Sequence, residues 1–221
     1  MFRILLLISA FLFGIAGREQ TAQTFQQEVK VTKDQSIELE LKFAEFIQVK
    51  GWKEDKLKIV AVVELDTDYP YEEVYQLIVD KNGQGCSVRS EYDFDKMNKY
   101  EVPHKNGAIR TSSHFKVKYQ IFLPKNQQFS LESINGDIEL REVKSKANVK
   151  TINGFIDLEW DTKEGADFSL STLHGDIYSD LDFPELTKRH VGAKLSHNYE
   201  GGGEEINLKV INGDIYLRKS K

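Results

Sequence analysis

The chain has 221 residues, of which 29% are charged and 40% hydrophobic. This balance excludes a disordered chain and fits a folded protein with one large or two small domains. Acidic residues outnumber basic ones by 35 to 30, for a formal net charge of -5, and the basic residues are interspersed with acidic ones. Because no basic stripe is available for a phosphate backbone, we expect no nucleic-acid partner.

Residues 1–16 have the pattern of a signal peptide. Arg3 precedes an apolar run from Ile4 to Ala16, and Gly14 and Ala16 are small residues at the spacing that signal peptidase requires. The run is shorter than the roughly 20 residues that cross a bilayer, and no later apolar run reaches that length. We therefore expect an exported mature chain without a transmembrane helix, located in the periplasm or at the cell surface. An uncleaved anchor is the alternative.

After the leader, the polar stretch 17–27 is typical of a linker, and period-two alternation begins beyond it. Ile37, Leu39 and Leu41 share one parity, with charged residues between them, which predicts a strand buried on one face. Similar patterns occur within 56–65, 73–80 and 114–124, whereas 92–113 is polar and irregular and predicts a long excursion. No amphipathic helix pattern occurs, although 183–195 could hold one helical turn. The fold class predicted is all-β.

Cys86 is the only cysteine, so an exported chain of this sequence forms no internal disulfide. We expect Cys86 to be a buried, small apolar side chain. An intermolecular bridge is the alternative reading.

Four near copies of one short pattern occupy the second half of the chain: LESINGDIEL from Leu131, VKTINGFIDL from Val149, LSTLHGDIYS from Leu170 and LKVINGDIYL from Leu208. The glycines are spaced by 18, 21 and 38 residues, and the last gap is close to two repeats. A missing copy would then fall within 191–206, where glycines obscure the pattern. Periods near 20 residues are typical of solenoids in which each repeat forms one coil.

The residue type at each position of the repeat has a physical explanation. Ile138 and its equivalents follow the glycine by two residues and form one inward row, and Leu131 and its equivalents form a second. The dipeptide between them suits a corner that needs positive φ, and the predicted corner residues are Asn135, Gly136, Asn153, Gly154, His174, Gly175, Asn212 and Gly213. The repeat therefore predicts strand, corner, strand. Asn-Gly between alternating apolar residues is also a hairpin signal, so four hairpins in a sandwich remain the alternative.

The repeats, preceded by YQIFLPKNQQFSLESINGDIEL and by VKGWKEDKLKIVAV, resemble the bacterial putative-adhesin family of exported β-solenoid proteins. The resemblance covers roughly residues 49–221 and departs from the family pattern at Phe155, where Asp is usual, and at His174, where Asn is usual. It implies an adhesin-head-like domain of unknown function: a right-handed parallel β-solenoid (β-helix) with coils of 18–21 residues and no established catalytic residue. We therefore expect an N-terminal β region at 28–123 and solenoid repeats at 124–221, either as two parts or as one continuous domain.

Repeated aspartates raise the alternative of a calcium ladder. Asp137, Asp176 and Asp214 follow the corner glycines, but Phe155 interrupts them and the last gap is expected to skip a rung. A single row of aspartates with gaps between them does not supply the roughly 6–8 oxygen ligands that calcium prefers. The favoured interpretation is therefore that these aspartates lie in turns and face the solvent. The five histidines show no HExxH or paired spacing for zinc; only His190 and His197 are loosely paired, and a plain loop position is as good an interpretation of them as a ligand role. We expect no metal site and no cofactor.

The outward strand positions give the remaining candidates. Glu139 and Asp157 could form an acid–base pair of a polysaccharide-acting β-helix enzyme, but charged outward residues are what any solvated strand carries. Tyr178 and Tyr216 share the outward row and Tyr199 lies in the glycine-rich insertion, so these three are the ligand-binding candidates. The sequence favours a non-enzymatic surface or cell-envelope module that binds a glycan or an envelope protein. A periplasmic structural or signalling component is the competing class.

Overall fold

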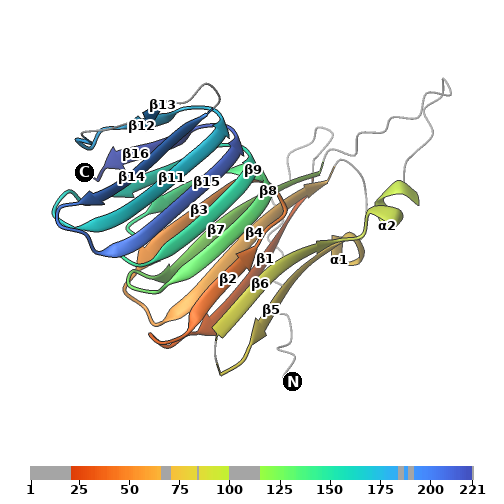
Figure 1. Cartoon of the computed structure of the whole chain (residues 1–221). Helices are drawn as coiled ribbons and strands as arrows, with labels where there is room; N and C mark the ends of the chain where they lie inside the picture. The colour runs from red at the N-terminus through yellow and green to blue at the C-terminus, as the bar shows by residue number, and fades with distance from the viewer. Residues whose placement is uncertain are drawn as a thin grey trace.

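The computed structural model describes residues 21–65, 71–83, 85–99, 115–183, 187–188 and 192–220. Within them, strands dominate and join into one mixed sheet of sixteen strands (Figure 1). The strands are β1 (Thr21–Lys30), β2 (Ser36–Glu40), β3 (Phe43–Trp52), β4 (Lys56–Leu65), β5 (Tyr75–Lys81), β6 (Gly85–Tyr92), β7 (Phe115–Pro124), β8 (Phe129–Arg141), β9 (Ala147–Asn153), β10 (Ile156–Trp160), β11 (Ala166–His174), β12 (Ile177–Ser179), β13 (Thr187–Lys188), β14 (Ala193–Tyr199), β15 (Glu204–Asn212) and β16 (Ile215–Lys219). The all-β prediction is confirmed.

The sheet folds into two walls that share β8. Its residues 129–135 pair with β2 and β9, while its residues 135–141 pair with β3 and β10. We call the strand series β5-β6-β2-β8-β9-β15-β11-β14-β13 the first wall, and the series β1-β4-β7-β3-β8-β10-β16-β12 the second wall. Figure 1 shows them as two layers, and the buried apolar side chains of both walls belong to one core cluster.

In the centre of both walls the repeats pair in parallel and in register. Ile156 lies opposite Ile138 on one side and Ile215 on the other, and Ile177 pairs with Ile215. The second inward row pairs in the same way, and its members are fully buried: Leu131, Val149, Leu208 and Leu170. Antiparallel pairs flank the parallel centre, for example β1 with β4 and β11 with β14, and the sheet does not close.

The repeats do not lie in space in their chain order. β15 pairs with β9 on one side and with β11 on the other, and β16 lies between β10 and β12 in the same way. Residues 204–219 are therefore inserted between 147–160 and 166–179. The expectation of a missing coil within 191–206 is wrong, because β14 in that stretch pairs antiparallel with β11.

A further coil precedes the repeats without sharing their sequence. β2 pairs with the first half of β8 and β3 pairs with its second half, so 36–52 follows the same path as a repeat. Its corner reads LKFA instead of Asn-Gly. The strands of the N-terminal region are thus hydrogen-bonded directly to the first repeat.

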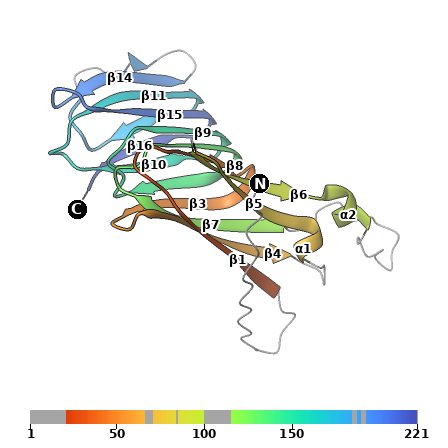
Figure 2. The same cartoon turned by 90° about the horizontal axis from the view of Figure 1, so that it is seen from below.

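Several local predictions need correction. The linker predicted at 17–27 is wrong from residue 21 onward, because β1 pairs along β4 and buries Phe25 and Val29 while its glutamines stay at the surface. Two short helices also went unpredicted, α1 (Tyr71–Val74) and α2 (Phe94–Lys99), which project from one end of the walls (Figure 2). The predicted signal peptide at 1–16 lies outside the described residues. None of the helices in the described part has the length and apolarity needed to cross a membrane.

The core contains Cys86, as expected, and also Trp160, and both are nearly inaccessible. It also contains a hydroxyl cluster: Tyr75 donates to Tyr119 at 3.1 Å, and the hydroxyls of Tyr92 and Tyr119 lie 3.1 Å apart. Burial raises the pKa of all three tyrosines well above the ordinary value, so they remain neutral in the folded protein.

Candidate functional site

The corner glycines allow the coils to approach one another. Gly136, Gly154 and Gly213 have positive φ, and a Cβ added at Gly154 or Gly213 would collide with the backbone oxygen of the preceding glycine in the stack. A Cβ at Gly175 would collide with Gly213 in the same way. Close packing of corners therefore requires glycine at these positions, in addition to the positive φ predicted from the sequence.

The corner asparagines form a hydrogen-bonded ladder. Asn153 donates its side-chain amide to Asn135 at 2.8 Å, and Asn212 donates to Asn153 at 2.8 Å. The asparagines do not have positive φ; their recurrence reflects these contacts between neighbouring coils. His174, which pairs with Asn212, occupies the outermost corner position of the four repeats. All eight predicted corner residues thus line up at one edge between the two walls.

The repeated aspartates hold adjacent corners together. Asp137 Oδ1 accepts the backbone N–H of Phe155 at 3.2 Å, and Asp214 Oδ1 accepts the backbone N–H of Asp176 at 2.8 Å. Asp214 and Asp176 belong to adjacent coils, so the expected skipped rung between them is wrong. Among the described residues, no group of three or more His, Cys, Asp or Glu side chains is arranged to hold a metal ion.

Two of the three predicted ligand-binding tyrosines lie together on the outer face of the second wall. The rings of Tyr178 and Tyr216 stack with centroids 5.3 Å apart and planes 13° from parallel, and Phe155 meets Tyr216 edge-on at 5.7 Å. We call these three rings the aromatic platform. Tyr178 is 50% exposed, and within the described residues its strand β12 has a partner on one side only, so one ring face remains open at the edge.

Polar groups surround the platform. The guanidinium of Arg218 lies 5.2 Å from the ring centroid of Tyr216, in cation–π geometry. The Tyr216 hydroxyl donates to Asp214 Oδ2 at 3.2 Å. Partial burial and the negative charge of Asp214 raise the pKa of Tyr216, so its hydroxyl stays protonated.

Asp157, one of the two acid–base candidates, forms ion pairs with two arginines. It is 6% exposed and accepts from Arg141 Nη1 at 2.9 Å and from Arg218 Nε at 2.7 Å. Arg141 also lies 3.4 Å from Glu139 and 3.4 Å from Glu159. The two carboxylates therefore belong to an arginine-centred network, with no open pair facing a cleft, which favours a structural role.

Tyr199, the third tyrosine, does not join the platform. It was expected to be exposed in the insertion, yet it is buried and packs against Phe168 and Phe183. The sequence signal was misleading because β14 pairs with β11 and turns this ring inward. His197 packs edge-on against Phe183 at 5.3 Å, and His190 lies outside the described residues.

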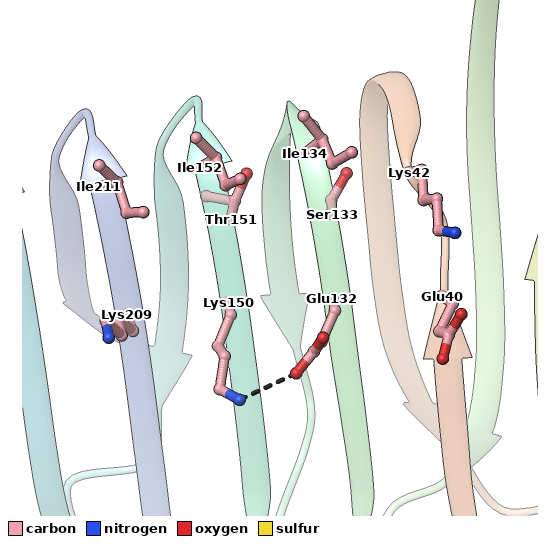
Figure 3. A pocket seen from close by; sticks show the side chains of 10 residues that line it. All are labelled: Glu40, Lys42, Glu132, Ser133, Ile134, Lys150, Thr151, Ile152, Lys209 and Ile211. Atoms are coloured by element: carbon pink, nitrogen blue, oxygen red, sulfur yellow. Dashed lines mark hydrogen bonds and ion pairs between the residues drawn. The ribbon is translucent and has the colours of Figure 1, made fainter.

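The first wall carries a second surface that the sequence reasoning missed. A groove of about 330 Å³ runs across the strands near the corner, and Figure 3 shows its lining side chains. One side is an aliphatic row made of the residues just before the corner asparagines: Ile134, Ile152 and Ile211. Leu173, just before the corner histidine, continues this row beyond the groove. Ile152 is 39% exposed and Leu173 is 50% exposed. The signal was present in the sequence, because these positions share the outward parity of Glu132 and Lys150 yet are apolar in all four repeats.

A charged row runs beside the aliphatic row. Successive pairing places its members side by side across the wall in the order Glu40, Glu132, Lys150, Lys209, Ser171 and Lys194. Lys150 forms an ion pair with Glu132 at 2.9 Å (Figure 3). Among the described residues, Glu40, Lys209 and Lys194 have no ion-pair partner within the chain. Across the central strands of the wall, Glu40 and Glu132 lie on one side of Lys150 and Lys209 lies on the other. Beyond Glu40 the row continues to Arg89 on β6, which forms ion pairs with Asp80 and Glu91.

Comparison with solved structures finds several to which the chain is similar. The chain is similar to a putative cell adhesion protein from Clostridium sporogenes, with a TM-score of 0.53 and 10% identity over 90% of this chain and 100% of that one. A putative adhesin from Bacteroides fragilis aligns with a TM-score of 0.32 and 11% identity, covering 91% of this chain and 99% of its own. A putative lipid binding protein from Parabacteroides distasonis aligns with a TM-score of 0.21 and 10% identity over 90% and 97% of the two chains.

No family model and no curated protein matches the sequence. At 10% identity, the Clostridium structure supports a shared fold and carries no residue-level assignment.

Proposed function

We propose that this chain is a non-enzymatic, adhesin-like binding module of the cell surface or envelope that holds a glycan on the aromatic platform. The open face of Tyr178 at the edge of the second wall is the observation that carries the proposal. Flat aromatic faces stack on the apolar faces of sugar rings, and Arg218 and Asp214 provide charged groups for hydroxyls beside them. The adhesion name given to the Clostridium relative supports the same reading.

The scaffold suits this role. We propose that the coils at 36–52 and 129–219 form a short β-solenoid, continuous with the N-terminal region, which holds the platform rigidly. The parallel in-register pairs and the fully buried inward rows support this interpretation. We also propose that the coils of this solenoid follow a right-handed path and that a signal peptide at 1–16 directs export of the chain.

Binding of the mature chain to a panel of immobilised bacterial and host polysaccharides tests the proposal. Tyr178→Ala is expected to weaken binding at least about tenfold, since base–ring or sugar–ring stacking contributes on the order of 1–3 kcal/mol. Phe94→Ala is the matched control, because Phe94 is similarly exposed but lies on α2, away from the platform. Binding that is insensitive to Tyr178→Ala, or absent across the panel, would contradict a glycan platform.

Protease treatment of intact cells separates the two cellular roles. Cleavage of the protein in intact cells is expected for a surface adhesin. Protection until the envelope is opened would instead favour the competing role, a periplasmic structural or signalling component. A polysaccharide-acting enzyme is disfavoured by the ion pairs around Asp157, and release of reducing ends from the same panel would revive it.

A further inference from the structure

The aliphatic and charged rows of the first wall form a surface that the glycan proposal leaves unused. Four apolar side chains recur at outward positions beside a groove, and contiguous exposed apolar surface marks interaction sites. Folding of one chain does not require them, because the inward rows already fill the core. Because the apolar side chain recurs in all four repeats, we expect a binding partner to cover this row.

The charges of the charged row indicate which charges that binding partner must carry. Glu40 and Glu132 on one side need basic partners, while Lys209 on the other side needs an acidic one. An anionic lipid surface would attract Lys209 but be repelled by Glu40 and Glu132. A complementary partner has an aliphatic row and, beside it, a charged row in which the acidic and basic residues follow in the opposite order.

A second copy of this chain has both rows, and we infer that the first wall is the interface of a face-to-face homodimer. A two-fold axis along β9 reverses the order of the strands in the second copy. Glu132 of each copy then faces Lys209 of the other, because β8 and β15 flank β9 on opposite sides. One rotation therefore produces two equivalent ion pairs, as a closed two-fold interface requires.

The same axis pairs the aliphatic rows. Ile152 faces its own equivalent, and Ile134 faces Ile211 of the second copy, so apolar side chains meet apolar side chains. Lys150 also faces its equivalent, and its charge is balanced by Glu132 of the same chain at 2.9 Å. On β8, β9, β15, β11 and β14 the side chains of the neighbouring outward row are small and uncharged, which lets two walls approach there: Ser130, Asn148, Asn207, Ser169 and Ser196. On β2 the same row carries Glu38.

The available area predicts a weak dimer. About five strands at roughly 4.8 Å spacing, each presenting about seven residues at roughly 3.4 Å, give on the order of 550 Å² per copy. Standard stable interfaces bury about 800 Å² per partner, so dissociation constants in the range of about 10–100 μM are expected. The tyrosines of the second wall face away from this interface, so the inference does not rest on the glycan proposal.

Sedimentation velocity of the mature chain between about 5 and 500 μM tests the dimer. The wild type is expected to shift from monomer to dimer across this range. Glu132→Lys and Lys209→Glu are each expected to weaken association at least about tenfold, because each places like charges across the interface. The double variant restores opposite charges in reversed order and is expected to return to within about threefold of wild type.

Glu64→Lys is the charge control, since Glu64 lies on β4 of the second wall and should leave association unchanged. Thermal melts of each variant establish that it is folded before its association is measured. A wild type that stays monomeric at 500 μM would overturn the inference. A double variant that associates no better than the single variants would overturn it as well, because that result excludes contact between Glu132 and Lys209.

Discussion

Tyr178 and Tyr216 stack face to face at 5.3 Å although three strands, β13, β14 and β15, lie between them in the chain. The contact exists because β16 pairs with β12, which places equivalent positions of the third and fourth repeats side by side. Period-two alternation assigned both rings to the outward face. Their adjacency depends on the spatial order of the repeats, which the alternation does not specify.

Replacing Asp157 should destabilise the fold more than replacing its partly exposed neighbour Glu159. Asp157→Asn removes the charge that pairs with both Arg141 and Arg218, and it leaves the largely buried Arg141 only the longer 3.4 Å contacts with Glu139 and Glu159. A loss of about 2–3 kcal/mol in the free energy of unfolding is expected. Urea denaturation measures it, with Glu159→Gln as a control expected to cost less than about 0.5 kcal/mol. Equal effects of the two substitutions would refute the central role of Asp157.

Replacing a glycine of the stacked corners by alanine should destabilise the fold. Gly154→Ala forces a Cβ against the backbone of Gly136 at a φ of 124°, so a loss of about 2–4 kcal/mol is expected. Gly83→Ala is the control, because nothing lies within 4 Å of an added Cβ there. Urea midpoints of the two variants make the comparison, and a Gly154→Ala protein as stable as Gly83→Ala would contradict the close approach.

Alkaline pH should unfold this protein through its tyrosine cluster. Burial raises the folded-state pKa of Tyr75, Tyr92 and Tyr119 above the unfolded-state value of about 10. Their contribution to stability is therefore complete below about pH 10 and is lost as the pH rises above it, by up to about 1.4 kcal/mol per pH unit for each tyrosine.

Urea denaturation at several pH values between about 8 and 11 measures this slope. Tyr92→Phe removes one of the three titrating groups, so its stability should fall less steeply over the same range. An unchanged slope in Tyr92→Phe would show that other groups control alkaline unfolding.

Cys86 should be inert in the folded protein. Burial raises the pKa of its thiol to about 11, and the side chain is 2% exposed. Because the thiolate is the reactive form, reaction with a thiol-specific chromogenic disulfide at about pH 8 should be at least about 100-fold slower in buffer than in denaturing urea. Comparable rates in the two solvents would place Cys86 at the surface.

Calcium should leave the melting temperature unchanged. Asp137 and Asp214 each commit an oxygen to a backbone N–H of the adjacent coil, which leaves a poor ligand set. A calcium site occupied at 100 times its dissociation constant would add about 2.7 kcal/mol, or roughly 5–10 °C for a chain of this size. Thermal melts with calcium and with a chelator distinguish the two cases.

The sequence predicted the features that depend on local pattern. Alternation identified the inward rows of Ile138 and Leu131, and the repeated Asn-Gly located the corners. The coil at 36–52 was missed because its corner lacks that dipeptide. Tyr199 was misassigned because antiparallel pairing of β14 with β11 buries its ring, and only tertiary structure determines that pairing.

The insertion of 204–219 between two earlier coils has a consequence for folding. A ribosome completes 166–179 well before 204–219. The strands of 166–179 hydrogen-bond to the strands made later, which in turn pair with 147–160, while Trp160 packs directly against Phe168. Until 204–219 is made, β9 and β10 lack their partner strand on that side, and β14 is the strand paired with β11. Closing this long loop carries an entropic cost before any contact offsets it, so this end of the molecule should fold last and slowly.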